Sequence, residues 1–204
     1  VVFLQYEGAK DHVEDWIAPG IMLNYKSDAG FETSDLQAII RQPTAMEGVG
    51  QVNTISVHLL EQRTRGRVSL RSTNPKDLVD IDSQMLTDPD DIKAIVRGME
   101  IIEQVANTKP MAEFYGNLFQ PNPTDDWTKY ARSTHDSFHH GVGTCAMGHS
   151  SNPNMVVDER LRVHGMANLR VGDASIMPTI VHAHTNNTSL MIGERLSDFV
   201  KDDD

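Results

Sequence analysis

The stretch HHGVGTCAMG at residues 139–148 places two neighbouring histidines at the head of a glycine-rich loop. A second short segment, HAHTNN at residues 182–187, carries two more histidines among polar residues. Histidine is the side chain whose ordinary pKa lies closest to neutral pH, so it can both accept and release protons there. The two segments are therefore candidates for one reaction centre in which two imidazoles meet.

The segment NLRVGDASIMP at residues 168–178 lies between the two histidine loops. Its apolar residues followed by Gly172 and Asp173 predict a short strand that runs into a Gly-Asp turn, a shape suited to meeting a cofactor. A simpler reading is also open, in which Asp173 only caps the residues that follow it.

The chain has 204 residues and a formal net charge of −11. This length is sufficient for a sizeable domain with a true core, and the negative charge argues against nucleic acid and anionic membranes as partners. Cys145 is the single cysteine, which excludes an internal disulfide framework and a four-cysteine metal site. The sequence opens with residues typical of a strand interior and without methionine, so we expect it to be a piece of a longer chain.

Alternating apolar and polar residues predict strands at residues 51–60 and 67–71. Because Thr64, Arg65 and Gly66 interrupt the two runs, we expect the strands to be antiparallel and joined through a tight turn. Residues 41–50 are expected to form a loop or an irregular strand connection, and residues 119–123 a loop.

The clearest helix is expected at residues 89–107. Asp88 is a suitable cap, Pro89 suits the first turn, and apolar residues then recur at helical spacing from Ile92 to Val105. This apolar stripe is interpreted as core packing. Further helices are expected at residues 125–137 and 189–200, and Gly193 in the last one suggests close approach of another backbone or of a cofactor.

Several motifs in order give the chain a family resemblance. It resembles the C-terminal part of a glucose-methanol-choline (GMC) oxidoreductase, a flavoenzyme that oxidises alcohols. The match comprises the pattern His-x-x-Gly-Thr-Cys-x-Met-Gly at residues 140–148, Val-Val-Asp at 156–158, Leu-Arg-Val-His-Gly at 161–165, the 168–178 segment, and Met-Ile-Gly-Glu-Arg at 191–195. A weaker match runs from residue 64 to residue 91.

The resemblance implies an α+β fold. Residues 1–138 would supply an antiparallel substrate-side sheet with covering helices, and residues 139–204 would carry the catalytic histidine loops and complete a Rossmann-like FAD-binding domain. The Gly-x-Gly-x-x-Gly turn that seats the FAD pyrophosphate in such enzymes does not occur in these 204 residues. We therefore expect the N-terminal FAD-binding portion of the same enzyme as a partner, possibly on a separate chain.

The same resemblance implies the catalytic residues. His140 matches the position that takes the proton of the alcohol, and His184 matches the second position, which is histidine or asparagine in the family. The chain thus resembles the branch with two histidines. His139 and His182 compete for these roles, but the family spacings favour His140 and His184.

The residues implied to approach FAD are Asp173, Ala174, Thr185 and Asn186. Asp173 and Ala174 would lie near the ribityl chain and the pyrophosphate, whereas Thr185 and Asn186 would reach the pyrimidine edge. A zinc site built from the clustered histidines is a rival interpretation, which the glycine and asparagine neighbours and the lack of helical histidine spacing disfavour.

The resemblance favours FAD-dependent oxidation of an alcohol, with proton abstraction and transfer of a hydride to flavin N5. Two alternatives stay open. One is a hydroxynitrile lyase on the same scaffold, in which FAD is structural and a histidine acts as acid and base. The other is a non-catalytic fragment that keeps the motifs and lacks the cofactor. The substrate that the resemblance implies is a small-molecule alcohol.

Overall fold

The computed structural model describes residues 1–8 and 21–202. The chain divides into two compact units. The first unit comprises Val1–Arg65 and Gln84–Phe138, and the second comprises Gly66–Ser83 and His139–Asp204. The assignment of a substrate side and a cofactor side to parts of the chain remains a prediction.

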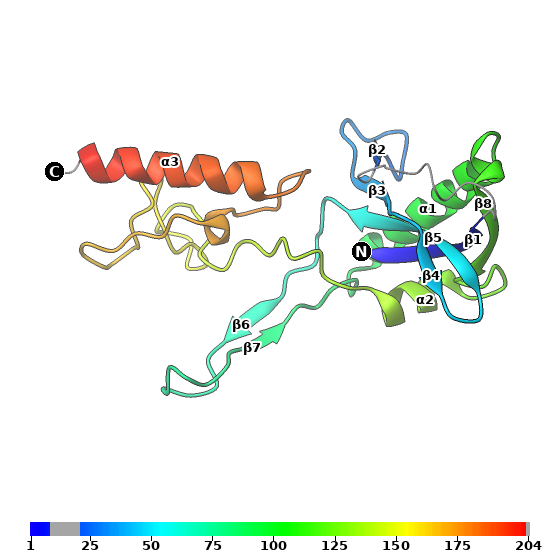
Figure 1. Cartoon of the computed structure of the whole chain (residues 1–204). Helices are drawn as coiled ribbons and strands as arrows, with labels where there is room; N and C mark the ends of the chain where they lie inside the picture. The colour runs from blue at the N-terminus through cyan, green and yellow to red at the C-terminus, as the bar shows by residue number, and fades with distance from the viewer. Residues whose placement is uncertain (9–20, 203–204) are drawn as a thin grey trace. The chain divides into compact units, whose positions relative to one another are not determined.

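The first unit is built on a six-stranded antiparallel sheet (Figure 1). Its strands run in the order β2-β3-β5-β1-β8, and β4 pairs with β5 beside this path. The strands are β1 (Val2–Gly8), β2 (Met22–Tyr25), β3 (Leu36–Ile40), β4 (Thr44–Met46), β5 (Gly50–Leu59) and β8 (Tyr115–Gln120). The alternation that predicts β5 from sequence is thereby confirmed, as is the strand at the start of the chain.

Helix α1 (Pro89–Ala106) packs against β3 and β5 (Figure 1). The Asp88 side chain accepts a hydrogen bond from the N–H of Asp90, which confirms the expected cap. The predicted stripe is buried at Ile92, Ile95, Met99 and Ile102, but its last member, Val105, is exposed. Gly98 allows the close approach, because a Cβ atom there would lie 2.9 Å from Leu36 Cδ1. Helix α2 (Trp127–Thr134) packs against α1 and β1.

The expected hairpin between residues 51–60 and 67–71 is wrong. Strand β6 (Arg67–Ser69) pairs with β7 (Asp80–Asp82), in the second unit. The reason lies at the start of α1, where the carboxylate of buried Asp91 accepts hydrogen bonds from the N–H groups of Arg63 and Thr64. These bonds hold the chain after β5 against α1, so it cannot fold straight back onto β5.

Four other segments differ in detail from expectation. The connection at residues 41–50 contains the short strand β4, and the expected loop at 119–123 begins inside β8, which pairs with β1 through an irregular register. Helix α2 is shorter than expected because Asp126 caps its start and His135 is already extended. The last helix is longer, since α3 spans Asn186–Asp202.

The second unit consists mainly of loops beside α3, with the 3-10 helix η2 (Ala174–Ile176) among them (Figure 1). Its core contains Val157, Leu161, Ile176, Met177 and Ile192. The expected strand at 169–171 is reduced to an isolated bridge between Arg162 and Arg170.

Gly172 follows this bridge. A Cβ atom there would lie 2.4 Å from Leu196 Cδ2 on α3, so the absence of a side chain lets the turn lie against the helix.

No helix in residues 1–8 or 21–202 is both long and apolar enough to cross a membrane.

Candidate active site

The first histidine loop is held by backbone hydrogen bonds to η2. The N–H of Cys145 donates to the carbonyl of Ser175 at 2.9 Å, and the N–H of Met147 donates to the carbonyl of Ile176 at 2.8 Å. Gly143 takes a φ of +90°, a left-handed conformation that glycine adopts without steric cost. The glycine-rich sequence is therefore explained by a loop that turns sharply while remaining pinned to the segment that follows residue 173.

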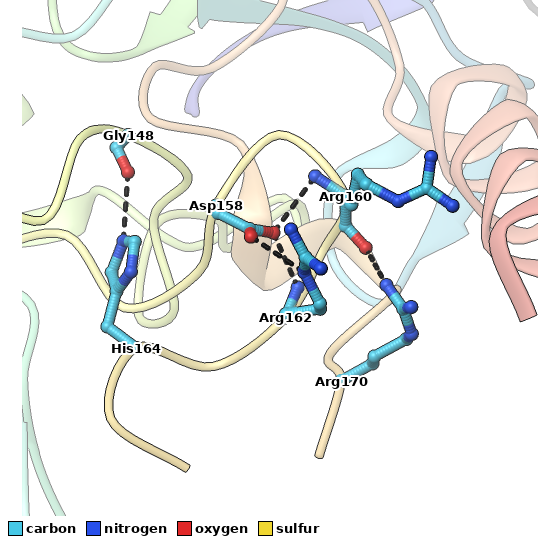
Figure 2. A network of polar contacts seen from close by, with 6 residues as sticks. All are labelled: Gly148, Asp158, Arg160, Arg162, His164 and Arg170. Carbon is cyan, nitrogen blue, oxygen red and sulfur yellow. Dashed lines mark hydrogen bonds and ion pairs between the residues drawn. The ribbon is translucent and has the colours of Figure 1, made fainter. Parts of the chain in front are cut away.

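A polar network ties together residues 158–170 of the second unit (Figure 2). The carboxylate of Asp158 accepts hydrogen bonds from the N–H groups of Arg160 and Arg162 and from Arg162 Nε, at 2.8 to 2.9 Å. Desolvation raises the pKa of Asp158, but the bonds from Arg162 and Arg160 outweigh it and hold this pKa below its ordinary value. Arg170 in turn donates to the carbonyl of Arg160.

His164 belongs to this framework. Its Nε2 lies 3.0 Å from the carbonyl oxygen of Gly148, the last residue of the first histidine loop (Figure 2). Because a carbonyl oxygen can only accept, His164 Nε2 must carry a hydrogen. The structure thus gives His164 a supporting role in holding the loop.

The structure brings the two predicted catalytic histidines together. His140 Nε2 lies 3.1 Å from His184 Nδ1, and the two rings are nearly perpendicular with centroids 5.1 Å apart. Both side chains are partly buried, whereas His139 and His182 are exposed. His139 has a φ of +61°, which marks a sharp bend in the backbone immediately before His140. The geometry therefore pairs the residues that the family spacing selects.

Burial, followed by the charges of His184 and His139, lowers the pKa of His140 from the ordinary value of 6.5. A lowered pKa means that the His140 imidazole is mostly neutral at pH 7. A neutral imidazole has one ring nitrogen with a lone pair, which is what a proton acceptor needs.

Thr185 makes a contact that the sequence did not predict. Its Oγ1 lies 2.8 Å from His140 Nδ1, on the opposite side of the ring from His184. The side chain is 7% exposed. The sequence placed Thr185 among the residues that approach FAD. No signal in the sequence pointed to a partner for His140, because the last helix was expected to begin only at residue 189 and the contact joins residues 45 positions apart.

Asp173 and Ala174 lie at the start of η2. The Asp173 side chain accepts a hydrogen bond of 2.8 Å from the N–H of Ser175 and caps this helix. Hydrogen bonds from the Ser175 side chain and backbone lower the pKa of Asp173. The simpler interpretation of Asp173 as a turn cap thus describes its contacts, and an approach of Asp173 and Ala174 to a cofactor remains a prediction.

Helix α3 presents unsatisfied donors at its first turn, beside the histidine pair. Within residues 1–8 and 21–202, no hydrogen bond joins the N–H groups of Asn186, Asn187 or Thr188 to another residue, as is usual for the first turn of a helix. The positive end of the helix dipole lies at the same place. Such a terminus can bind carbonyl oxygens or a negative charge.

Within residues 1–8 and 21–202, no three or more histidine, cysteine, aspartate or glutamate side chains are grouped so that they could hold a metal ion. Of the four clustered histidines, His140 and His184 are in direct contact.

Comparison with known proteins places this arrangement in a family. A family model described as GMC oxidoreductase matches residues 62–193. The chain is 37% identical to an alcohol dehydrogenase [acceptor] of Pseudomonas putida over 156 residues, which cover 74% of this chain and 28% of that protein. It is 34% identical to choline oxidase of Arthrobacter globiformis over 189 residues, covering 90% of this chain and 33% of that protein.

Solved structures have the same fold. Pyridoxine 4-oxidase from Mesorbium loti superposes with a TM-score of 0.79 at 19% identity, covering 97% of this chain and 42% of that chain. An FAD-dependent oxidoreductase from Chaetomium thermophilum superposes with a TM-score of 0.70 at 26% identity, covering 84% and 28% respectively.

The fold and the motifs define a flavoenzyme class, and the resemblance noted in the sequence is confirmed. The chain belongs to the GMC oxidoreductase family and corresponds to its C-terminal part. It spans about a third of the length of the curated relatives it matches.

FAD is the cofactor of this family. The residues present fit it, because the first turn of α3 offers N–H donors and a positive dipole end next to the histidine pair. These features suit the carbonyl-bearing edge of a flavin, which gains negative charge on reduction.

Proposed function

We propose that the protein containing this chain oxidises the CH–OH group of a small alcohol with FAD as the oxidant. The observation that carries the proposal is the contact between His140 and His184 beside the first turn of α3. The relatives support it, since two of them are named alcohol dehydrogenase and choline oxidase.

His140 is the proton acceptor in this proposal. Its pKa is lowered by burial and by the neighbouring histidines, so the ring is neutral at pH 7 and Nε2 can take the hydroxyl proton of the alcohol. As the proton moves to His140, the carbon loses its hydrogen with the electron pair and the C–O bond becomes a carbonyl. FAD, when bound, supplies the acceptor for that hydride at N5.

His184 orients the alcohol. Its Nδ1 lies within hydrogen-bond distance of His140 Nε2, so a hydroxyl that replaces the direct contact between the rings can bond to both imidazoles. Two bonds to one oxygen restrict the rotation of the alcohol and hold its reacting carbon in a fixed direction. Positioning of this kind accelerates a reaction because little rotational freedom is left to lose.

The first turn of α3 stabilises the negative charge that develops on the flavin during the reaction. The N–H groups of Asn186 and Asn187 and the Asn186 side chain are donors next to His184 and Thr185 in sequence. In the proposal, Asn186 donates to the pyrimidine edge of the flavin and thereby stabilises its negative charge. Asp173 and Ala174 are proposed to lie along the ribityl and pyrophosphate part of FAD.

The test is anaerobic mixing of the full-length, FAD-loaded protein with a panel of primary alcohols, including choline and aromatic alcohols. The proposal expects bleaching of the flavin absorbance with formation of one aldehyde per flavin. A hydroxynitrile lyase would leave the flavin oxidised while it releases cyanide from a cyanohydrin, and a non-catalytic protein would do neither. If no alcohol in the panel bleaches the flavin and the protein cleaves a cyanohydrin, the protein is a lyase and the proposed activity is wrong.

A further inference from the structure

Thr185 occupies the position of a helix cap without performing that function. Its carbonyl accepts the first bond of α3, from the N–H of Ser189 at 2.9 Å. A threonine at this position ordinarily turns its hydroxyl back to accept from an N–H of the first turn. Here the Oγ1 lies 2.8 Å from His140 Nδ1 instead. The Thr185 hydroxyl therefore contacts the His140 ring in place of an N–H group of the first helical turn.

The direction of this hydrogen bond follows from counting donors and acceptors. The Thr185 side chain is 7% exposed, so its hydroxyl hydrogen needs an acceptor inside the protein. Among the residues that the structure describes, the hydrogen-bond partner of Oγ1 is His140 Nδ1. If the hydroxyl donates to Nδ1, a neutral His140 must carry its hydrogen on Nε2. That hydrogen then points at His184 Nδ1, 3.1 Å away.

We propose that Thr185 is the positioning residue of His140, and that its hydroxyl determines which ring nitrogen of His140 carries the hydrogen. In the resting pair the hydroxyl donates to Nδ1, and His140 Nε2 donates to His184. Before His140 acts as the proton acceptor, the ring exchanges its hydrogen with solvent water, which takes the hydrogen from Nε2 and returns one to Nδ1. The same hydroxyl oxygen then accepts the hydrogen bond from Nδ1, which leaves the lone pair of Nε2 available to take the proton of the alcohol. The inference rests on the proposed function of His140.

The chemistry of the side chain explains why a threonine suits this position. A hydroxyl can donate one hydrogen bond and accept others, so it satisfies Nδ1 in both states of the ring. A carboxylate or a backbone carbonyl could only accept, and would fix the hydrogen on Nδ1 permanently. Valine has nearly the same shape and can do neither.

The first arm of the test needs no substrate. The full-length, FAD-loaded protein is labelled with ¹⁵N in its histidine rings, and the His140 resonances are assigned by comparison with His140→Gln. Above the pKa of His140, the inference expects a hydrogen on Nε2 and a lone pair on Nδ1. In Thr185→Val the Nδ1 resonance moves and the two neutral forms mix, whereas Thr185→Ser retains the wild-type pattern. A wild-type His140 with its hydrogen on Nδ1 in the resting state would overturn the inference.

The second arm measures anaerobic flavin reduction by the alcohol. Because misplacement of a reacting group can cost up to about 10²-fold in rate, Thr185→Val is expected to slow reduction by roughly 10-fold to 10²-fold at a nearly unchanged KM. Thr185→Ser is expected to restore the rate to within a few-fold. FAD content and Tm are recorded for every variant, so that loss of fold is recognised. If Thr185→Val loses FAD, the comparison of wild type with Thr185→Ser and the resting-state spectrum still decide.

The two arms separate this inference from the proposed function. If His140→Ala leaves the reduction rate unchanged, the proposed function of His140 fails, while the ¹⁵N spectrum still reports whether Thr185 determines the ring hydrogen. If His140→Ala abolishes reduction and Thr185→Val reduces the flavin as fast as wild type, the proposed function stands and the positioning role of Thr185 is wrong.

Discussion

His140 and His184 are 44 positions apart in the sequence, and their imidazoles lie in hydrogen-bond contact, with 3.1 Å between Nε2 and Nδ1. The loop of His140 is pinned to η2, and His184 leads directly into α3. The contact therefore depends on how η2 and α3 pack together around Ile176 and Ile192. Substitutions at the pair and in its supports should consequently have separable effects.

Substitution of His184 should distinguish an orienting group from a proton acceptor. His184→Asn retains a hydrogen-bond donor and is expected to slow anaerobic flavin reduction less than His184→Ala, which retains none. Single-turnover reduction rates at saturating alcohol provide the comparison. Equal rates for the two variants, both as low as that of His140→Ala, would instead make His184 a proton carrier.

The pH dependence of the reaction should follow the pKa of His140. Because burial and the neighbouring histidines lower this pKa from 6.5, the ring stays neutral to a lower pH than an ordinary histidine. The reduction rate should therefore be constant through pH 7 and fall only as the pH drops below 6.5, when His140 becomes protonated. Stopped-flow reduction between pH 5 and pH 9 measures the midpoint; a midpoint above 6.5 would contradict the assignment.

Asp158 should be important for stability. Asp158→Ala removes the acceptor of three hydrogen bonds from Arg160 and Arg162, and is expected to cost about 2 kcal/mol in the free energy of unfolding. Asp198→Ala is the matched control, since it removes only an exposed contact of 3.6 Å with Arg195 and should change stability by less than about 1 kcal/mol. Denaturant unfolding of both variants tests the difference, and equal losses would show that the network contributes little.

Substitution by alanine should have different effects at two glycines of the second unit. A Cβ atom at Gly172 would lie 2.4 Å from Leu196 Cδ2 and 3.1 Å from its Cβ, so Gly172→Ala should destabilise the protein by roughly 1–3 kcal/mol. A Cβ atom at Gly193 meets nothing within 4 Å in this structure. If Gly193 faces the cofactor, as its sequence position suggests, Gly193→Ala should weaken FAD binding without lowering the Tm of the FAD-free protein. Titration with FAD measures this, and unchanged affinity would remove Gly193 from the cofactor site.

The elements that local sequence determines were predicted well. Helix α1 has its cap, its proline and its apolar stripe in one continuous segment, and β5 has a long alternation. The pairing of β6 was not predictable in the same way. It depends on buried Asp91, which holds residues 63 and 64 at the start of a helix more than twenty residues later. Sequence alternation carries no information about such a contact.

The same difference between local and long-range features applies to the candidate site. The spacing of family motifs was sufficient to select His140 and His184 among nine histidines. The sequence did not predict the contact of Thr185 with His140. A threonine before a helix is ordinarily a cap, and only the packed structure shows where its hydroxyl lies. A polar contact that replaces a helix cap can be recognised only when the structure shows the two distant segments together.

The central claim is that His140 accepts the proton of the alcohol, and the single-turnover rate of anaerobic flavin reduction by His140→Ala tests it most directly. Loss of a positioned base costs about 10²-fold to 10⁴-fold, so the variant should retain its FAD and be reduced more slowly by that factor. His149→Ala, at an exposed histidine whose ring contacts Ser151, is the control and should react like wild type. A His140→Ala variant that binds FAD and is reduced within a few-fold of the wild-type rate would contradict the account.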